Sequence, residues 1–307
     1  MIVYEPNKNF LKDIRHLAKS WTMTKILRSV VGVGIYAAAV CIPLEYFNIS
    51  ENLMLNPSIF SLLGVVLSIL LVFRTNSAYD RWWEGRKQWG ALVNNCRNLA
   101  ITVRATFDKD NLADRHQMAV YISNFCIAFK EHLRKGVKMD ELIFLSEEDK
   151  EVYANKSHVP NHISYQMYQL VQDARKRDEI SGEDLLNFKP QLQSFLDILG
   201  ACERIKKTPI PFSYAVYIKI FILAYALVMP VALASTFHLL AIPLTMFVFF
   251  AFIGIELMAE EIEMPFGLDC NNLPTGTIAH TIKENVFEIL EAKKGNTEVR
   301  ELYQKVF

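Results

Sequence analysis

The chain has 307 residues, and its 33 basic residues balance 33 acidic residues, so the formal net charge is zero. This balance excludes a strongly basic protein of the kind that binds nucleic acids through bulk charge, and we expect no nucleic-acid partner. The hydrophobic content of 51% is concentrated in blocks at residues 26–49, 57–73 and 208–258. Segments of this kind, without a polar face, would aggregate in water, so a membrane protein is favoured over a soluble bundle.

Residues 1–25 precede the first apolar block and combine basic residues with apolar residues at helical spacing. We expect a cytoplasmic amphipathic helix here, packed on other cytoplasmic helices or lying in the lipid headgroup layer. The block that follows, residues 26–49, is too long for the core of a signal peptide. It is long enough to cross a hydrocarbon core of about 30 Å, which needs about 20 helical residues.

The other apolar blocks predict further membrane helices. Residues 57–73 form a second span near the short end of the permitted range. The last block is too long for one span and divides into residues 211–233 and 239–258. The sequence therefore predicts four transmembrane helices, the first two within residues 26–74 and the last two within residues 209–258.

Basic residues set the predicted orientation. Arg74, Arg81 and Arg86 follow the second span. The segment that joins the first two spans carries Glu45 and Glu51 but no Lys or Arg. By the positive-inside rule, both termini and the long polar middle of the chain face the cytoplasm.

The polar regions predict helices and no strands. Residues 75–208 have apolar residues at helical spacing, such as Leu92, Cys96 and Leu99, and few alternating β-branched runs. Residues 259–307 form a cytoplasmic C-terminal segment with one more amphipathic helix. The expected fold class is all-α, with a large cytoplasmic helical region.

No catalytic motif is present, so we expect neither enzyme activity nor a cofactor. His158 and His162 have the spacing of zinc ligands on a helix, but Pro160 between them argues against one regular helix. We therefore expect a solvated turn and no metal site.

Two groups of charged residues lie at or within the last spans. The acidic run from Glu256 to Glu263 is interpreted as a solvated rim at the end of a helix that leaves the membrane. Lys219 lies inside the third span, where a charge either has a function or snorkels to the cytoplasmic boundary.

The second span has two distinct faces. Gly64 and Ser68 belong to a stripe of small residues, which suits close approach of another helix. Leu62, Val66 and Leu70 form a bulky apolar stripe at i, i+4 and i+8. The spacing alone favours lipid contact or packing, but around a symmetry axis the same stripe would form apolar rings that gate ions by dewetting.

The segment FRTNSAYDRWWEGRKQWGALVNNCRNLA, which begins at the end of the second span, resembles the bacterial branch of the bestrophin family. TPIPFSY before the third span, MPFGLDCNNLP after the fourth and QDARKRDEIS in the middle region are also similar to segments of that family. The resemblance runs in order over residues 5–295. It implies a funnel-shaped homopentamer in the lipid bilayer of a bacterial inner membrane, with the second spans lining a pore for inorganic ions.

Carried over residue by residue, the resemblance assigns the apolar neck of the pore to Leu62, Val66 and Leu70. A one-residue slip to Leu63 and Leu67 is the alternative register.

The resemblance also implies a second constriction, a cytoplasmic aperture at Ile180. Asp178, Glu179 and, on the outer side, Glu51 would form ion-attracting rings if they face the axis, and are surface charges otherwise. The family's motif residues are expected to hold helices or subunits together and to pack. They are Arg74, Asp80, Arg81, Trp82, Trp83, Arg86, Pro265, Phe266 and Gly267.

One departure from the family concerns calcium. Animal members hold calcium near the Pro-Phe-Gly segment with a run of acidic residues, whereas the stretch from Leu268 to Asn272 has one carboxylate, Asp269. Calcium prefers six to eight oxygen ligands, several of them charged. We therefore expect neither calcium binding nor calcium gating.

The permeating ion is predicted to be a monovalent cation, because the resemblance to bacterial members implies it and the outer segments are acidic. The alternatives are an anion channel of the same fold, a secondary transporter, and a membrane-anchored scaffold that binds a cytoplasmic partner. A secondary transporter would favour inverted repeats with polar sites at the membrane midplane, and the sequence shows no such symmetry.

Overall fold

The computed structural model describes residues 21–47, 57–269 and 271–293. Within these ranges every regular element is a helix, which confirms the predicted all-α class. Residues 1–20 of the predicted N-terminal helix and Glu51 lie outside the described residues.

The described residues form α-helices and two 3-10 turns. They are α2 (Trp21–Tyr46), α3 (Pro57–Thr106), α4 (Leu112–His132), η2 (Met139–Glu141), α5 (Glu147–Ala154), α6 (Val159–Lys176), α7 (Gly182–Lys207), α8 (Phe212–Phe237), η3 (His238–Leu240), α9 (Ala241–Glu263) and α10 (Thr275–Ile289).

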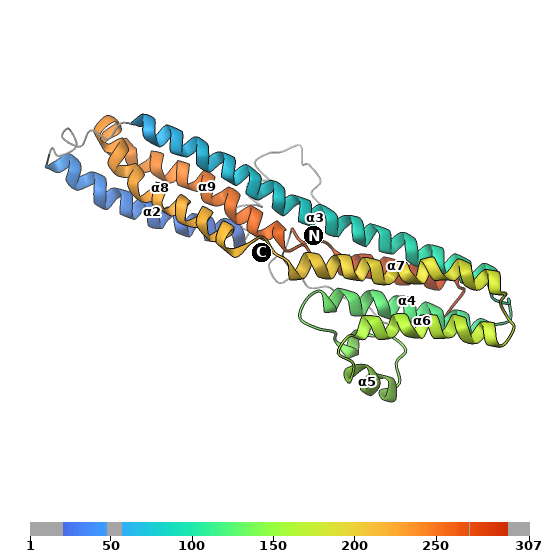
Figure 1. The fold of residues 1–307 in the computed structure, drawn as a ribbon. Coiled ribbons are helices and arrows are strands. Elements are labelled where there is room, and N and C mark those ends of the chain that lie inside the picture. Colours follow the sequence, from blue (N-terminus) through green and yellow to red (C-terminus); the bar gives the residue numbers. More distant parts are fainter. Residues whose placement is uncertain (1–20, 48–56, 270, 294–307) are drawn as a thin grey trace, which may run out of the picture.

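Helix α3 is the longest element, with 50 residues. At 1.5 Å per residue it is about 75 Å long, more than twice the hydrocarbon thickness of about 30 Å. The helix continues past Arg74 without interruption, through the predicted boundary between residues 26–74 and 75–208. Figure 1 shows α3 running along both halves of the molecule. One helix therefore joins an apolar half to a charged half.

Helices α8 and α9 pack against the first part of α3, and α2 packs on α8 and α9; we call this half the apolar bundle (Figure 1). In the described part of the chain, three continuous helical stretches are long and apolar enough to cross a membrane: Thr22–Tyr46, Ser58–Thr106 and Phe212–Glu263. The last stretch has 52 residues and contains both α8 and α9, which η3 joins and which pack side by side. The last apolar block of the sequence therefore folds as a helical hairpin.

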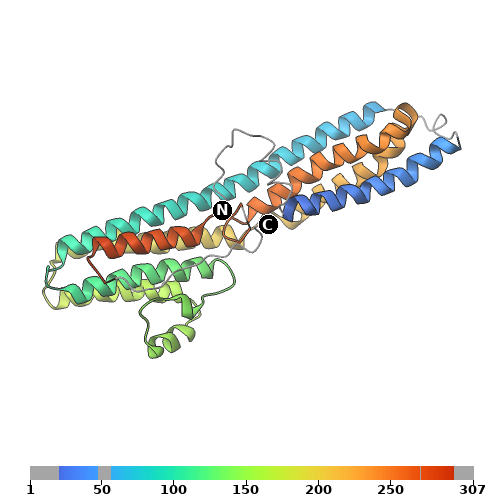
Figure 2. The same ribbon diagram turned by 180° about the vertical axis from the view of Figure 1, so that it is seen from behind.

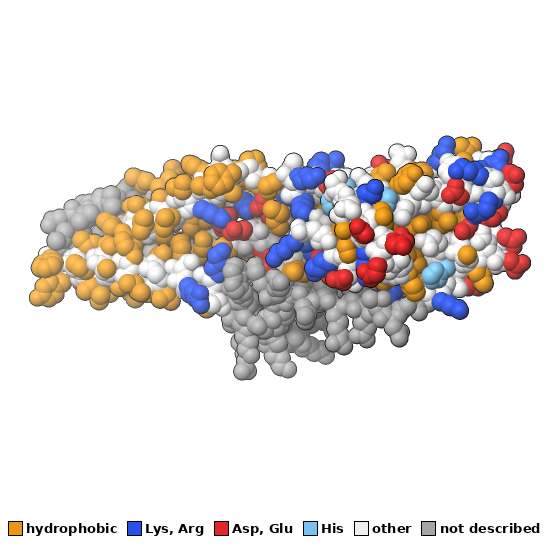
Figure 3. All heavy atoms as spheres, turned by 90° about the horizontal axis from the view of Figure 1, so that it is seen from below, with side chains coloured by type: hydrophobic (Ala, Val, Ile, Leu, Met, Phe, Trp, Pro, Cys, Tyr) orange, Lys and Arg blue, Asp and Glu red, His pale blue; other side chains and the backbone are white. Residues whose placement is uncertain are grey.

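The second part of α3 packs against α4, α7 and α10, and α6 packs on α4 and α7; we call this half the charged bundle (Figure 2). Its core includes Trp89 of α3 stacked on Phe129 of α4, with ring centroids 5.2 Å apart. Figure 3 shows hydrophobic side chains covering one end of the molecule, while Lys, Arg, Asp and Glu side chains gather over the other. The surface thus changes from apolar to charged along the length of α3.

Candidate functional site

The exposed face of α3 in the apolar bundle carries two of the three predicted neck residues. Leu62 is 66% exposed and Val66 is 43% exposed. Leu70 is half-buried, and its carbonyl accepts a hydrogen bond from the Tyr214 hydroxyl of α8 at 3.3 Å. The stripe therefore lies on the surface of the single chain at Leu62 and Val66, and meets α8 at Leu70.

The alternative register places its residues on the inner side of α3. Leu67 is fully buried in the core of the apolar bundle, and Leu63 is half-buried. A side chain enclosed by its own subunit cannot line a pathway between subunits. The burial pattern therefore favours Leu62 and Val66 over Leu63 and Leu67.

Gly64 of α3 lies against α8. A Cβ atom on Gly64 would lie 3.0 Å from the Tyr225 hydroxyl, which donates a hydrogen bond to the Phe60 carbonyl at 3.1 Å. Ser68 is exposed, and its hydroxyl donates to the Gly64 carbonyl within α3 at 2.8 Å. The absence of a side chain at Gly64 thus lets α8 approach α3 closely.

A buried charge cluster lies where α3 leaves the apolar bundle. Nη2 of Arg74 is 2.7 Å from Oε2 of Glu263, and Glu256 of the same helix α9 is also buried beside Arg74. The prediction that this acidic run is a solvated rim is wrong for Glu256 and Glu263, because both are buried beside the guanidinium of Arg74. Glu260 faces outward and pairs with Lys219 of α8 at 2.9 Å, with both side chains half-exposed.

Arg81 of α3 connects the C-terminal ends of α7 and α9. Its Nη2 donates to the Ile205 carbonyl and its Nη1 to the Thr208 carbonyl, both at 2.5 Å. Its Nε donates to the Glu263 carbonyl at 3.1 Å. Carbonyls at the end of a helix have no intrahelical partner and carry partial negative charge, so a guanidinium both satisfies and neutralises them.

The other motif residues of α3 lie on either side of Arg81 in the sequence. Trp82 and Trp83 stack with ring centroids 6.5 Å apart, and the indole N–H of Trp82 donates to the Asn271 carbonyl at 3.0 Å. Asp80 and Arg86 are exposed on the same helix. Trp82 thus anchors the loop after α9, whereas Asp80 and Arg86 lie on the outer surface of the single chain.

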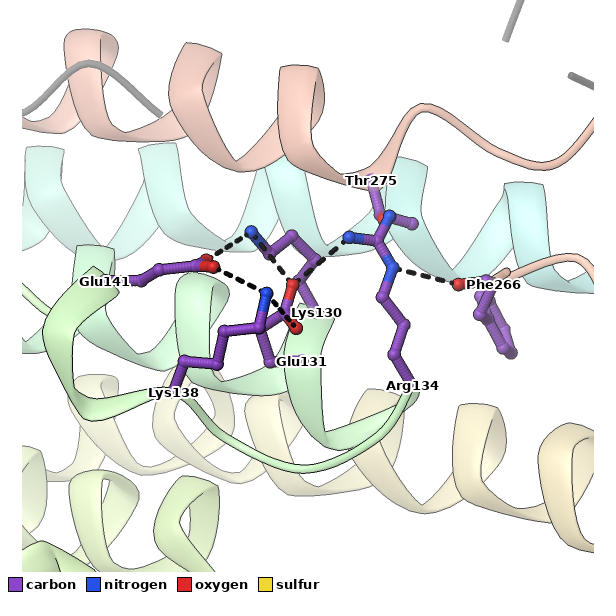
Figure 4. Close-up of polar contacts among 7 residues, drawn as sticks. All are labelled: Lys130, Glu131, Arg134, Lys138, Glu141, Phe266 and Thr275. Atoms are coloured by element: carbon purple, nitrogen blue, oxygen red, sulfur yellow. Dashed lines mark hydrogen bonds and ion pairs between the residues drawn. The ribbon is translucent and has the colours of Figure 1, made fainter. Parts of the chain in front are cut away.

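The segment Pro265–Gly267 packs into the junction between the two bundles. Phe266 is buried, and a Cβ atom on Gly85 of α3 would lie 3.1 Å from its ring, so glycine allows this close approach. Arg134, which follows α4, donates from Nε to the Phe266 carbonyl at 3.2 Å and from Nη2 to the Thr275 hydroxyl at 2.9 Å (Figure 4). One arginine therefore links α4, this segment and the start of α10.

The loop after Gly267 is closed by the buried side chain of Asn272. In the amide orientation that satisfies its neighbours, its nitrogen donates to the Met264 carbonyl at 2.9 Å, and its oxygen accepts from the backbone N–H groups of Asp269 and Leu268 at 3.0 and 3.3 Å. A single amide side chain thus satisfies the backbone groups at the centre of this loop.

The turn from α6 to α7 directs Ile180 into the core of the charged bundle. Asp178 has a φ of 58°, and the Glu179 N–H donates to the Ala174 carbonyl at 3.0 Å, which is the geometry of a left-handed helix C-cap. Ile180 is 3% exposed, whereas Asp178 and Glu179 are exposed. Each acidic residue pairs with an arginine, Asp178 with Arg175 at 2.8 Å and Glu179 with Arg177 at 2.7 Å.

His158 and His162 do not share a site, and the predicted solvated turn between them is wrong. Pro160 lies in the first turn of α6, where its missing N–H costs nothing, and His158 is the N-cap. His162 packs against Tyr153, with ring centroids 5.4 Å apart. The helix begins earlier than the sequence suggests because Pro160 starts it rather than breaking it.

Two residues that the sequence did not single out, His132 and Glu203, lie beside His158. Burial alone would raise the pKa of Glu203, but hydrogen bonds from His158, His132 and Lys207 outweigh it and lower that pKa to about 2. Burial lowers the pKa of His132 below its ordinary 6.5. His132, His158 and Glu203 are far apart in the chain, so no local sequence motif predicts that they lie together.

Comparison with known proteins places the chain in one family. A family model described as "Bacterial/Fungal Bestrophin protein" matches residues 1–288. Two proteins named voltage-dependent anion channel-forming protein are similar. The one from Nostoc is 33% identical over 276 residues (85% of this chain, 88% of that protein), and the one from Synechocystis is 33% identical over 233 residues (74% and 76%). A solved bacterial bestrophin homologue from Klebsiella pneumoniae shares the fold, with a TM-score of 0.82 at 24% identity, over 88% of this chain and 100% of that chain.

Proposed function

Because the chain belongs to the bacterial and fungal bestrophin family, we propose that it forms an ion channel in a membrane. The observation that carries the proposal is α3, which exposes Leu62 and Val66 along the apolar bundle and continues as one wall of the charged bundle. Repeated around a symmetry axis, these side chains form stacked apolar rings that hold back ions by dewetting. Leu70 completes the proposed neck on its cytoplasmic side.

The proposed channel is a homopentamer whose α3 helices surround the pore. The exposed apolar side chains of α3 and the exposed Asp80 and Arg86 are the surfaces that neighbouring subunits would cover. Native mass spectrometry of the detergent-purified protein tests this assembly. A pentameric mass supports the proposal, whereas a stable monomer or dimer as the sole species contradicts it.

The proposed location is the inner membrane of a bacterium, with the charged bundle and both termini in the cytoplasm. Arg74 and Arg81 lie where α3 leaves the apolar bundle, and at the opposite end Glu45 lies 3.0 Å from His238. This asymmetry of basic residues follows the positive-inside rule. A fusion reporter that is active only in the cytoplasm, placed at the C-terminus, tests the orientation, and a silent reporter on an expressed protein contradicts it.

A second constriction is proposed at the turn between α6 and α7. In the single chain this turn presents Asp178 and Glu179 to the outside, whereas Ile180 is held in the core. Ile180 is the proposed aperture residue, and Asp178 and Glu179 on the exposed side of the same turn would form ion-attracting rings if they face the axis.

A monovalent cation is the first candidate for the permeating ion, because the outer end of the chain carries Glu45 and, in the sequence, Glu51. An anion is the second candidate, favoured by the names of the Nostoc and Synechocystis relatives. The reversal potential of channels reconstituted in a NaCl gradient distinguishes them. A reversal potential near the sodium equilibrium value supports the cation proposal, and one near the chloride value refutes it.

Flux measurements separate the channel from the other two candidate functions. Flux through a channel rises in proportion to the driving force. Flux that saturates with ion concentration would indicate a secondary transporter. Pentamers that assemble but carry no flux would indicate a membrane-anchored scaffold.

The channel is proposed to work without calcium. The stretch from Leu268 to Asn272 offers Asp269 as its one carboxylate. Calcium needs six to eight oxygen ligands, several of them charged. Isothermal titration with calcium tests the proposal, and tight uptake in a fixed ratio to the chain would overturn it.

A further inference from the structure

Three side chains from separate parts of the charged bundle converge at one point away from the proposed pore neck. His132 is the last residue of α4, His158 caps α6, and Glu203 lies in α7. Nε2 of His132 is 2.5 Å and Nε2 of His158 is 2.8 Å from the same oxygen of Glu203. The two imidazole centroids are 4.4 Å apart, and all three potential ligand atoms lie within 4.8 Å of one another.

We propose that His132, His158 and Glu203 bind one divalent transition-metal ion, with zinc as the best-matched metal. Two imidazole nitrogens and one carboxylate oxygen are the set found in zinc sites that keep a fourth position for water. The nitrogen ligands argue against magnesium and calcium, which prefer oxygen ligands. Below we call these residues the His-His-Glu cluster.

The geometry of the cluster requires a small opening to admit the ion. Zinc lies about 2.0–2.2 Å from nitrogen and oxygen ligands, so a tetrahedral site separates neighbouring ligand atoms by roughly 3.3 Å. The present separations of 2.5 and 2.8 Å to Glu203 therefore have to grow by less than about 1 Å. All three side chains are partly exposed, which leaves them room for such rotamer adjustments.

An ion can reach the cluster from solvent. His158 and Glu203 line a surface pocket of about 550 Å³, together with Tyr165, Tyr168 and Leu199 among others. The pocket also offers space for the water that would fill the fourth coordination position.

Two local contacts have to give way when the metal binds. Nδ1 of His158 accepts the Asn161 N–H at 3.3 Å, and metal on Nε2 moves the ring proton to Nδ1 and ends this contact. At 3.3 Å it lies beyond the usual range for such a hydrogen bond, so its loss costs little. The ammonium of Lys207, 3.3 Å from Glu203, sits on an exposed side chain that can swing into solvent.

Cobalt binding by the purified full-length protein tests the proposal, because tetrahedral cobalt with imidazole and carboxylate ligands absorbs visible light and occupies zinc sites. After treatment with a chelator, the protein is titrated with Co²⁺ and then with competing Zn²⁺. We expect one Co²⁺ per chain, displaced by Zn²⁺. Glu203→Gln and His158→Asn are each expected to weaken binding by more than the roughly 10- to 100-fold that loss of an outer-shell partner costs.

The variants are chosen to keep the fold. Asparagine is a good N-cap, so His158→Asn removes the ligand while preserving the start of α6. His162→Asn makes the same change four residues further along α6, outside the cluster, and is expected to bind cobalt like the wild type. Helical circular dichroism and gel filtration verify that each variant folds. Absence of saturable cobalt uptake, or uptake that is unchanged in both Glu203→Gln and His158→Asn, would overturn the proposal, whatever the channel activity.

Discussion

Nε of Arg74 and Oε2 of Glu256 lie 3.5 Å apart in the interior of the protein, yet they form no hydrogen bond with each other. Arg74 donates instead to Glu263, whose other carboxylate oxygen accepts the Ile210 N–H at 2.8 Å. Among the described residues, neither oxygen of Glu256 has a hydrogen-bond donor. The cluster thus combines one arginine with two glutamates, and only Glu263 has a hydrogen-bond donor for each of its carboxylate oxygens.

This imbalance predicts opposite outcomes for two substitutions. Arg74→Met is expected to lower the free energy of unfolding by about 3–5 kcal/mol, because it leaves buried carboxylates without their cation. Glu256→Gln removes the charge that lacks donors and is expected to leave stability unchanged or to raise it. Thermal unfolding of the detergent-purified variants measures both effects.

Lys219→Met is the control for this comparison. Lys219 of α8 and Glu260 of α9 form a half-exposed ion pair on the helical hairpin that also carries Glu256. Its loss is expected to cost less than about 1 kcal/mol. Equal destabilisation by Arg74→Met and Lys219→Met would contradict the buried role of Arg74.

The proposed neck predicts a gain of conductance. Replacing Leu62, Val66 and Leu70 together with alanine is expected to raise single-channel conductance, because smaller side chains widen and wet an apolar constriction. Leu67→Ala is the control on the same helix, and it should cost about 2–5 kcal/mol of stability without raising conductance. Planar-bilayer recording measures the conductance of both variants. A rise in conductance seen only in Leu67→Ala would identify the alternative register, with Leu63 and Leu67 in the neck.

Arg81 is expected to stabilise the end of α7. Arg81→Lys keeps the charge, but an ammonium cannot reproduce the planar fork that reaches several carbonyls. We expect a loss of about 1.5–3 kcal/mol, the range for a hydrogen bond to a charged group. Hydrogen exchange should speed up in the last turn of α7 in this variant but not in Arg86→Lys, which changes an exposed arginine on the same helix. Unchanged exchange near Ile205 would refute this role.

Glu141 is expected to make stability depend on pH. Burial alone would raise its pKa, but hydrogen bonds from Lys130 and Lys138 outweigh it, so its pKa lies below 4.5 (Figure 4). A carboxyl group whose pKa is lowered by folding stabilises the protein above the unfolded pKa and loses that effect as the pH falls through the folded one. Glu141→Gln should therefore be less stable than the wild type at pH 7, and the gap should close below pH 4.5.

The exposed pair of Glu147 and Lys150 gives the matched control for this pH series. Glu147→Gln is expected to leave stability unchanged at either pH, because water screens this exposed pair. Chemical denaturation at several pH values measures the gap. A gap for Glu141→Gln that persists unchanged at acid pH would show that its carboxylate charge is not what stabilises the fold.

Much of the fold was predictable because helical periodicity is a local property of the chain. The sequence predicts one amphipathic helix within residues 259–307, and α10 spans Thr275–Ile289. Pro160 shows the limit of such local rules, since proline breaks a helix in its interior but is favoured in its first turn. Only the hydrogen bonding of His158 as the N-cap distinguishes these two cases.

The sequence by itself determined which segments are helical, which are apolar, and to which family the chain belongs, because short motifs and spacing carry that information. The tertiary structure decided which ionisable groups are buried, as with Glu256 beside Arg74. It also decided that Ile180 turns into the core and that His132 meets His158 across Glu203. These relationships depend on which helices pack against each other, and a contact between distant residues leaves no periodic trace in a single sequence.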